Sequence, residues 1–260
     1  MEPVLVSLDA GVLCLTLNRP ERLNAFNLDM HRALAEAMSR AESESAIRCL
    51  LITGAGRGFC AGADLTTRDM KSAEPLDLGA MLDKHYNPLV RRMRALPKPI
   101  VCAVNGVAAG AGANFALACD IVLAARSASF IQAFVKIGLV PDCGGTYFLP
   151  RLAGTQRAMA LAMTGERLSA EDAERFGLIW KCVDDDRLIS EAEKISTALA
   201  AGPTKSLGLI KKAVYASAGN NLSDQLDMER DLQREIGKGT DYREGVTAFL
   251  EKRKPSFKGS

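Results

Sequence analysis

The sequence predicts an α/β fold in which helices cover a β-sheet. Up to about residue 150, short apolar runs typical of strands alternate with amphipathic segments typical of helices. Glycine-rich turns follow two of the apolar runs, and the chain beyond residue 200 has the apolar spacing of helices. With 260 residues, 48% of them hydrophobic, the chain is long enough to bury one large core.

The first elements are indicated by a turn and by a helix cap. Residues 4–18 predict two strands joined at Asp9-Ala10-Gly11. Residues 27–44 predict an amphipathic helix capped by Asn27, because an asparagine side chain at this position accepts a hydrogen bond from the first turn. A short apolar strand that ends in glycine follows at residues 47–56.

The alternation of helix and strand then continues. Residues 77–96 predict a helix that ends before two prolines, which cannot continue the backbone hydrogen bonding. A buried strand at residues 100–106, a helix at 112–120 and a strand at 121–125 follow. The order of these elements favours helices packed over a sheet.

The pattern changes beyond about residue 150. Ser169 and Gly177 predict the N-cap and the C-terminal end of a short helix, and further helical segments run from residue 187 to about 252. The last 60 residues therefore predict a helical appendage, which more often makes subunit contacts than chemistry.

Charge and cysteine usage exclude several classes of function. Lys and Arg total 33 against 31 Asp and Glu, too balanced for a nucleic-acid or membrane-surface binder. No apolar run approaches the roughly 18 residues of a membrane span, and the N-terminus lacks the pattern of an export signal. The seven cysteines are scattered among apolar residues, typical of buried thiols rather than disulfides or metal ligands. We therefore expect a cytoplasmic protein without a metal.

Only two histidines are present, and both lie in predicted helices. His31 and His85 have no orienting partner nearby in the sequence, which argues against a role as general base. A carboxylate is therefore the leading acid/base candidate.

Two glycine-rich junctions, residues 56–65 and 105–115, follow apolar strands. Small residues let the backbone turn sharply, and N–H groups at the start of a helix point outward and favour negative charge. Side by side, the two junctions would stabilise one carbonyl oxygen that becomes charged. Each alone is as consistent with tight packing of a helix on a strand, and neither fits a phosphate-binding loop.

Asp142 is the only acidic residue between positions 121 and 165. The run Pro-Asp-Cys-Gly-Gly is typical of a turn, so Asp142 could cap a helix that begins near Gly144. The residues before it, 139–141, are apolar, and desolvation by such neighbours raises a carboxyl pKa toward the range useful for proton transfer. The turn and the functional interpretation both stay open on the pattern alone.

Six motifs along the chain carry a resemblance to a known family: NRPERLNAFN, FCAGADL, NGVAAGAG, CDIVLAA, GLVPDCGGT and FLEKRKPSF. Together they resemble the crotonase, or enoyl-CoA hydratase/isomerase, superfamily over essentially the whole chain. The resemblance implies a spiral of strand-strand-helix repeats that binds acyl-CoA in residues 1–200, and a helical oligomerisation region in residues 201–260. It also implies a homotrimer or a dimer of trimers that acts on acyl-CoA thioesters, with no cofactor besides the coenzyme A of the substrate.

The resemblance assigns roles by position. The backbone N–H groups of Ala63 and Ala111 would form the oxyanion hole for the thioester carbonyl. Ala111 replaces the usual glycine, which leaves the amide in place. The positions that match coenzyme A contacts are Arg22, Ala61, Asp64, Leu65, Phe249 and Lys252. In the family the last two are often supplied by a neighbouring subunit, although a solvated charge explains Lys252 equally well.

The acids depart from the hydratase pattern. Hydratases use two glutamates, and the matching positions are Asn114 and Phe134, neither of which can move a proton. Simple hydration is therefore not expected. Because some members carry an acid in the loop of Asp142, we expect this residue to remove a proton α to the thioester and to return it at the γ carbon, while the two amides stabilise the enolate.

Longer matches, among them ERLNAFN, TGAGRGFCAG and DYREGVTAFLEKR, resemble the isomerases of aerobic phenylacetate breakdown. The resemblance implies conversion of the ring 1,2-epoxide of phenylacetyl-CoA to an oxepin-CoA, with Δ3- to Δ2-enoyl-CoA isomerisation as a second activity. Three alternatives stay open. They are a general Δ3,Δ2-enoyl-CoA isomerase or hydratase-like enzyme of fatty-acid oxidation, an aspartate nucleophile acting on an aryl-CoA, and a non-catalytic acyl-CoA-binding subunit.

The sequence leaves the acyl group undetermined. Met70, Met81, Leu82 and Tyr86 fall in a region that could line an acyl pocket. At helical spacing such residues are more often part of the core.

Overall fold

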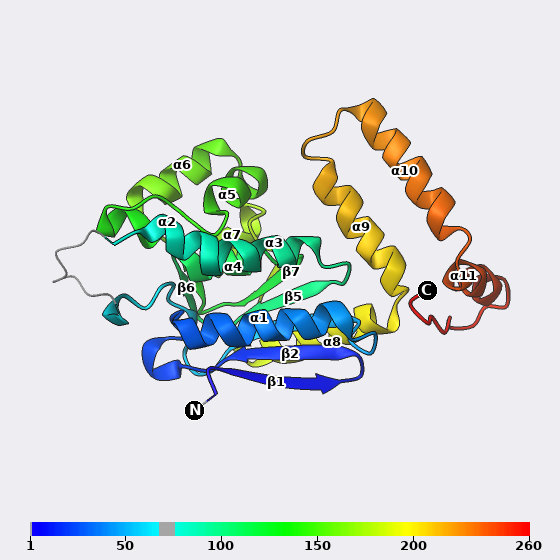
Figure 1. Ribbon diagram of the computed structural model, residues 1–260, viewed down its shortest axis with the longest axis horizontal. Coiled ribbons are helices and arrows are strands. Elements are labelled where there is room, and N and C mark those ends of the chain that lie inside the picture. The colour runs from blue at the N-terminus through cyan, green and yellow to red at the C-terminus, as the bar shows by residue number, and fades with distance from the viewer. Residues whose placement is uncertain (1, 68–75) are drawn as a thin grey trace.

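The computed structural model describes residues 2–67 and 76–260, and within them the strands form two sheets (Figure 1). The larger sheet has the strand order β1-β2-β3-β5-β7-β10, and the smaller one has the order β4-β6-β8-β9. From β3 to β8 the strands alternate between the sheets, so each turn of the chain adds one strand to each sheet. The strands are β1 (Val4–Asp9), β2 (Val12–Leu17), β3 (Cys49–Gly54), β4 (Gly58–Cys60), β5 (Ile100–Val104), β6 (Val107–Ala109), β7 (Ile121–Ala125), β8 (Ser129–Ile131), β9 (Arg167–Ser169) and β10 (Lys181–Val183).

Helices cover the sheets, and three of them form a separate arm. In Figure 1, α1 lies over the larger sheet, whereas α9, α10 and α11 extend away from the body. The α-helices are α1 (Leu28–Ser43), α2 (Leu78–Met81), α3 (Asn87–Ala95), α4 (Ala111–Leu117), α5 (Gly145–Ala153), α6 (Thr155–Thr164), α7 (Ala170–Arg175), α8 (Leu188–Ala201), α9 (Thr204–Ala216), α10 (Leu222–Ile236) and α11 (Thr240–Leu250). Shorter helical turns are η1 (Pro20–Arg22), η2 (Leu65–Thr67), η3 (Leu82–Tyr86), η4 (Ala133–Ile137) and η5 (Asp185–Arg187).

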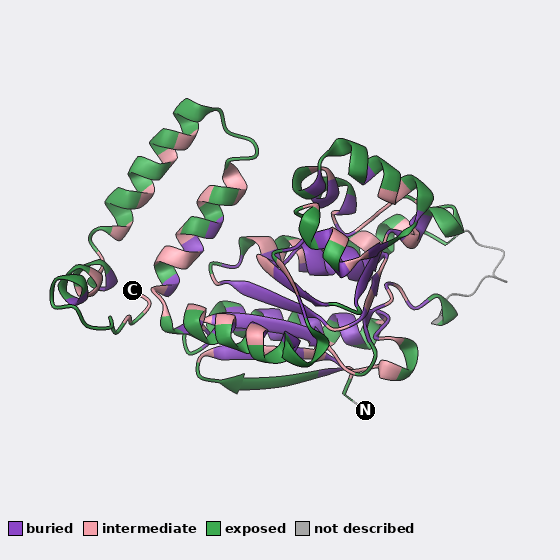
Figure 2. Cartoon of the chain, turned by 180° about the vertical axis from the view of Figure 1, so that it is seen from behind, coloured by how far each residue is buried: buried purple, intermediate pink, exposed green. Residues whose placement is uncertain are grey.

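The larger sheet forms the centre of the core. β1 pairs antiparallel with β2, and the other neighbouring strands of this sheet pair in parallel. Every residue of β5 is buried, because elements cover both faces of the sheet at this point. Figure 2 shows the buried residues gathered in the sheets and the exposed ones on the arm. The sequence prediction of an α/β core with a helical C-terminal region is confirmed.

The predicted helix ends agree with the structure. The Asn27 side chain accepts a hydrogen bond from Met30 N at 2.9 Å, and Ser169 Oγ accepts one from Asp172 N at 3.1 Å. The predicted helix over residues 77–96 differs, because η3 interrupts it with one turn of π-helix. A π-turn holds an additional residue in the turn and often occurs next to functional sites.

The two glycine-rich junctions also differ from the prediction, which had each lead directly into a helix. A strand of three residues lies in each junction, β4 in the first and β6 in the second, and the two pair with each other in the smaller sheet. After β4 the chain forms only the short turn η2, whereas α4 follows β6. Strands this short show no alternation that a sequence pattern could reveal.

Buried polar contacts join the arm to the body. The Lys211 ammonium of α9 lies 2.8 Å from Asp120 Oδ2 and donates to Met93 O at 2.8 Å. Arg48 donates to Thr204 Oγ1 at 2.8 Å and to Phe257 O at 3.2 Å. These contacts connect residues that are far apart in the sequence and fix where the arm begins.

The described part of the chain has neither a membrane-spanning helix nor a cluster of metal-ligating side chains. In this part of the chain no helix has both the length and the apolar character needed to cross a membrane. Nor do three or more His, Cys, Asp or Glu side chains gather there in a group that could hold a metal ion.

Candidate active site

A cavity of about 670 Å³ brings together segments that are distant in the sequence. The start of α1, the end of the first glycine-rich junction, the α2–η3 segment and the loop before α5 form its walls. The lining residues are Phe26, Asn27, Leu28, Asp29, His31, Arg32, Ala63, Asp64, Leu76, Leu78, Met81, Leu82, Tyr86, Leu139, Val140, Pro141 and Asp142. We call it the Asp142 cavity.

The segment at residues 61–64 is held in place by the loop that precedes α1. Ala61 N donates to Leu23 O at 2.9 Å, and Phe26 exchanges two backbone hydrogen bonds with the segment, at 2.7 Å to Gly62 O and 2.9 Å from Asp64 N. The buried Asn24 side chain donates to Gly58 O of the junction at 2.8 Å and to Ala55 O just before it at 2.9 Å. The wall that carries Ala63 is therefore fixed by backbone pairing.

At the end of this wall, Asp64 forms an ion pair with Arg19. Its carboxylate accepts from Arg19 Nη2 at 2.9 Å and from the Thr66 hydroxyl at 2.6 Å. The Thr66 hydrogen bond, and after it the Arg19 guanidinium, hold the pKa of Asp64 below its usual range. The carboxylate is thus engaged inside the protein, which points to a structural role in shaping the segment at residues 61–64.

The two glycine-rich junctions meet at Gly62 and Ala111. Gly62 has a φ of +90°, and a Cβ at this position would lie 2.9 Å from Ala109 O and 3.3 Å from Ala111 N. A Cβ on Gly112 would lie 2.2 Å from Cys60 O. Only glycine permits this close approach of backbone to backbone.

The amides of Ala63 and Ala111 are available for a ligand. Within residues 2–67 and 76–260, neither N–H donates a hydrogen bond, and Ala111 N belongs to the first turn of α4, where helical N–H groups have no partner within the helix. Two such donors on adjoining segments are suited to bind one oxygen that gains negative charge. The oxyanion-hole assignment stays a prediction, and the geometry supports it.

A chain of side-chain amides anchors the loop of Asp142. Gln132 Nε2 donates to Asn114 Oδ1 at 2.8 Å, and Asn114 Nδ2 donates to Asp142 O at 2.8 Å. Asn114 is fully buried. The position that matches one hydratase glutamate therefore holds the backbone of the loop that bears the carboxylate.

The loop is strained next to Asp142. Cys143 has a φ of +49°, in the left-handed region that residues with a Cβ rarely adopt. Burial, followed by the charge of Asp142, raises the pKa of the Cys143 thiol, so this cysteine stays protonated. A strained residue fixed by buried hydrogen bonds gives the neighbouring carboxylate a defined position.

One expectation about Asp142 needs correction. The N-cap of α5 is Gly144, and no side chain caps this helix, although Asp142 O accepts from Gly145 N at 2.9 Å. Among the apolar neighbours of Asp142, Val140 is 79% exposed. Asp142 Oδ1 is nevertheless buried, and the residue lines the cavity.

His31 is a cavity residue that sequence reasoning placed outside the site. Its ring is 5% exposed and stacks on Phe26 at a centroid distance of 5.2 Å. Burial, and to a smaller extent the proximity of His85, lower the pKa of His31 to about 4. A neutral imidazole of this acidity is a poor general base at neutral pH, as the sequence suggested, but its location in the wall was missed.

Comparisons with known proteins point to one family over nearly the whole chain. The family model described as enoyl-CoA hydratase/isomerase matches residues 7–260. The chain belongs to the enoyl-CoA hydratase/isomerase family. Among relatives of this family, it is 57% identical over 260 residues to a 1,2-epoxyphenylacetyl-CoA isomerase of Escherichia coli K12, covering 100% of this chain and 99% of the relative. It is also 47% identical over 249 residues to a probable enoyl-CoA hydratase of Rhodobacter capsulatus, covering 96% and 95%.

Solved structures of the family confirm the fold. A putative enoyl-CoA hydratase/isomerase from Mycobacterium abscessus superposes with a TM-score of 0.92 at 35% identity, covering 98% of both chains. An enoyl-CoA hydratase from Bacillus anthracis gives a TM-score of 0.93 at 32% identity, covering 99% of this chain and 100% of the other. The crotonase-like spiral inferred from the motifs is therefore the fold of this chain.

The remaining family positions fall into two groups. Ala61 and Leu65 flank the cavity wall, and Arg22 lies exposed in η1 before the loop that pairs with this wall. Phe249, at the end of α11, is 82% exposed, and Lys252 is exposed just beyond it. Figure 1 places α11 and α2 on opposite sides of the molecule, so a single copy does not bring α11, which carries Phe249, to the Asp142 cavity that α2 lines.

The residues predicted for an acyl pocket are placed as follows. Met81, Leu82 and Tyr86 line the Asp142 cavity, and the π-turn η3 supplies Leu82 and Tyr86. Met70 lies outside the described residues. Phe134, at the position of the second hydratase glutamate, is buried, and a Cβ on Gly110 would lie 3.7 Å from its ring.

Proposed function

We propose that this chain is an isomerase of acyl-CoA thioesters that converts ring-1,2-epoxyphenylacetyl-CoA to oxepin-CoA and also shifts Δ3 double bonds of enoyl-CoA to Δ2. The 57% identity over the full chain to the E. coli isomerase supports this choice of substrate. The observation that carries the mechanism is one carboxylate, Asp142, in the same cavity wall as the Ala63 segment, while Asn114 is engaged in anchoring its loop.

The proposed chemistry begins with an enolate. The amides of Ala63 and Ala111 donate to the thioester oxygen and stabilise the charge that develops when the α carbon loses a proton. Asp142 accepts this proton. The product is an isomer of the substrate, so every atom is conserved, and the proton returns to another carbon of the same acyl group.

One base serves both substrates in this scheme. In a Δ3-enoyl-CoA, Asp142 returns the proton at the γ carbon, and the double bond moves into conjugation with the thioester. In the ring epoxide, the bond between the two epoxide carbons breaks as the seven-membered oxepin ring forms. Asp142 removes the α proton, the electron pair left behind forms a double bond from the α carbon to the ring, and the proton is returned to a ring carbon. Neither path needs an external water or a redox cofactor.

The test compares two carboxylates of the same cavity. We expect Asp142→Asn to lower turnover of a Δ3-enoyl-CoA and of the ring epoxide by roughly 10²- to 10⁴-fold, the range associated with general acid–base catalysis. The control, Asp29→Asn, alters an exposed residue at the cavity rim whose carboxylate is 3.3 Å from Arg32. Turnover of Asp142→Asn near the wild-type rate on both substrates would overturn the proposed role.

Substrate profiling separates the alternatives. A general Δ3,Δ2-enoyl-CoA isomerase would prefer linear chains over the ring epoxide, and a hydratase-like enzyme would add water to a Δ2-enoyl-CoA. An aspartate nucleophile would leave a covalent acyl-enzyme that mass spectrometry detects. A non-catalytic acyl-CoA-binding subunit would bind these thioesters without exchanging their α protons in deuterated water.

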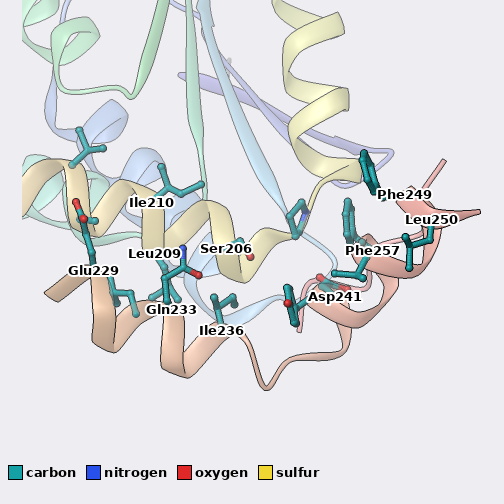
Figure 3. A pocket seen from close by; sticks show the side chains of 17 residues that line it. Ser206, Leu209, Ile210, Glu229, Gln233, Ile236, Asp241, Phe249, Leu250 and Phe257 are labelled. Atoms are coloured by element: carbon teal, nitrogen blue, oxygen red, sulfur yellow. The ribbon is translucent and has the colours of Figure 1, made fainter. Parts of the chain in front are cut away.

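We also propose that the chain assembles as a homotrimer or a dimer of trimers through residues 201–260, with residues 1–200 as the acyl-CoA-binding core. Helices α9, α10 and α11 enclose a cavity of about 640 Å³, here called the C-terminal cavity, and Figure 3 shows Ile210, Phe249 and Leu250 around it. These three side chains are 58%, 82% and 74% exposed. Exposed apolar surface of this extent favours burial against another copy.

Assembly would also complete the coenzyme A site. Phe249 and Lys252 match coenzyme A contacts but lie far from the Asp142 cavity of their own chain. A neighbouring copy would supply them. Light scattering coupled to size exclusion measures the mass directly, and a monomer at micromolar concentration would contradict this proposal. A cytoplasmic location is consistent with the seven free cysteines.

A further inference from the structure

The backbone that leads from Asp142 into α5 is packed against two buried side chains. Gly144, two residues after Asp142, has a φ of +79°, and a Cβ at this position would lie 2.6 Å from the ring of Phe148. A Cβ on Gly145 would lie 2.3 Å from Nδ2 of Asn114. Phe148 is 5% exposed and Asn114 is fully buried. The position of the loop therefore depends on the Phe148 ring as well as on Asn114.

The Phe148 ring is in turn in contact with Arg94, a partly buried residue of α3. The guanidinium carbon of Arg94 lies 5.1 Å from the centroid of the Phe148 ring and 3.0 Å from that of Tyr215, in α9. A guanidinium is planar and stacks favourably on aromatic faces. Within residues 2–67 and 76–260 it forms no ion pair, so these two rings are the contacts that hold it. Arg94 thus connects α5 with the arm.

Tyr215 has a fixed place relative to the larger sheet. Its hydroxyl donates to Asp120 Oδ1, and Asp120 Oδ2 accepts from Ile100 N at 2.8 Å. The Lys211 ammonium, one turn before Tyr215 in α9, lies 2.8 Å from the same Oδ2 atom. The ring on which Arg94 stacks is therefore anchored to the first residue of β5.

These contacts lie apart from the substrate. Arg94, Phe148 and Tyr215 line another cavity, of about 530 Å³. In the described part of the chain, its lining residues are all different from those of the Asp142 cavity. A change at Arg94 can therefore reach the reaction only through the protein, and the start of α5 is the nearest part of the site.

We propose that Arg94 is a positioning residue, which transmits the place of α9 to the loop of Asp142 through the Phe148 ring. The arm then acts on the reaction of its own chain, in addition to any contact with a neighbouring copy. The inference rests on the proposed function in taking Asp142 as the base. A displaced base loses rate steeply, because proton transfer requires hydrogen-bonding distance to the carbon that reacts.

The first test compares two arginines that stack on neighbouring rings of α5. Arg94→Met keeps a long side chain and removes the planar cation. We expect kcat for a Δ3-enoyl-CoA to fall roughly tenfold and KM to stay within about twofold of wild type, the pattern of a lost transition-state contribution. The control is Arg151→Met, because Arg151 stacks at 3.7 Å on the Tyr147 ring, which is 41% exposed. This variant should keep the wild-type kcat.

A conservative variant tests whether the planar cation is what counts. Arg94→Lys keeps the charge but loses the flat group that stacks on two rings. Its kcat should lie between those of the wild type and Arg94→Met, and it serves alone if Arg94→Met does not fold. A wild-type kcat for the Arg94 variants that fold, or a fall that Arg151→Met shares, would overturn the proposal.

A double variant tests the route through Phe148. Phe148→Leu removes the ring, so Arg94→Met added to it should leave kcat within about twofold of Phe148→Leu alone. Losses that multiply would show that Arg94 acts independently of Phe148, and would overturn the proposed route.

The same measurements separate this proposal from the proposed function. Turnover of Asp142→Asn at the wild-type rate would defeat the proposed function. A wild-type kcat for Arg94→Met beside a slow Asp142→Asn would defeat only the role of Arg94. A rise of KM at unchanged kcat would also defeat it, because Arg94 would then contribute to binding rather than to the position of the base.

Discussion

The Asp142 cavity and the C-terminal cavity have similar volumes, about 670 and about 640 Å³, but different kinds of residues line them. In the Asp142 cavity a buried imidazole without a partner in the described chain and the Asp142 carboxylate share the wall. In the C-terminal cavity the buried carboxylate, Asp241, accepts hydrogen bonds from the backbone of Lys258, Gly259 and Ser260. Asp241 is therefore satisfied inside the chain, and most of the other residues that line this cavity are apolar.

This difference indicates that the Asp142 cavity is suited to catalysis and the C-terminal cavity to association between copies. A cavity lined by a carboxylate and a buried imidazole keeps ionisable groups where burial shifts their pKa, as active sites do. A cavity with satisfied polar groups and exposed apolar side chains is suited to a protein surface. Changes in the first should therefore alter turnover and leave assembly intact, and changes in the second should alter assembly first.

The largest effect after removal of the Asp142 carboxylate should come from the meeting point of the two junctions. Gly112→Ala places a Cβ 2.2 Å from Cys60 O, so the backbone that presents Ala111 N must shift. We expect kcat to fall roughly 10²- to 10³-fold, the loss associated with one oxyanion donor. Gly219→Ala is the control, since the nearest atom to its Cβ would be 3.9 Å away. Equal activities of the two variants would argue against the oxyanion hole.

A smaller effect is expected when the loop anchor is removed. Asn114→Leu keeps the side-chain volume approximately but deletes the bonds to Gln132 and Asp142 O. We expect kcat to fall roughly 10- to 10²-fold, because small displacements of a catalytic group are costly, with the mass of the assembly unchanged. Asn220→Leu, at an exposed position, should have no effect on steady-state kinetics. A wild-type kcat for Asn114→Leu would show that the anchor does not position Asp142.

In the C-terminal cavity, Phe249→Asp should weaken assembly. The side chain is 82% exposed in one chain, and a carboxylate buried in an interface would lack a partner. We expect roughly a 30-fold or greater loss of association, typical of an aromatic interface residue, measured by sedimentation at several concentrations. Glu229→Gln, an exposed substitution at the same cavity, is the control. An unchanged mass at all concentrations would contradict the proposed interface.

The last effect concerns stability against pH rather than activity or assembly. The pKa of His31 is lowered from 6.5 to about 4, so the unfolded chain binds a proton below pH 6.5 that the folded chain refuses. The free energy of unfolding should therefore fall as the pH drops from 6.5 to 4, by about 3 kcal/mol more for wild type than for His31→Phe. Denaturant titrations at a fixed protein concentration measure this difference. Parallel pH profiles of the two proteins would show that the imidazole is not buried in its neutral form.

Much of the fold is predictable because its signals are local. Asn27 and Ser169 reveal helix starts through hydrogen bonds that span three residues, and the apolar runs of the larger sheet reveal buried strands. The three-residue strands β4 and β6 leave no such pattern, since pairing between distant segments creates them. The interruption at η3 is similarly invisible to helical spacing.

The site was only partly predictable, because some of its signals are local and others arise from contacts between residues distant in the sequence. Asp142 stands out as a lone acid in its sequence context, whereas its anchor through Asn114 and Gln132 links residues 28 and 18 positions apart. His31 could be recognised as a wall residue only after folding, when α1, η3 and the loop of Asp142 meet around one cavity. The nearest sequence signal was a histidine on the apolar side of a helix, which is more often part of the core.

The most direct measurement follows the proton itself. A Δ3-enoyl-CoA deuterated at the α carbon is converted by the wild-type protein and by Asp142→Asn, and mass spectrometry with NMR locates the label in the Δ2 product. If Asp142 carries the proton between two carbons, part of the deuterium appears at the γ carbon with the wild type, and Asp142→Asn slows both transfer and turnover by roughly 10²- to 10⁴-fold. Transfer of the label at the wild-type rate by Asp142→Asn would contradict the account.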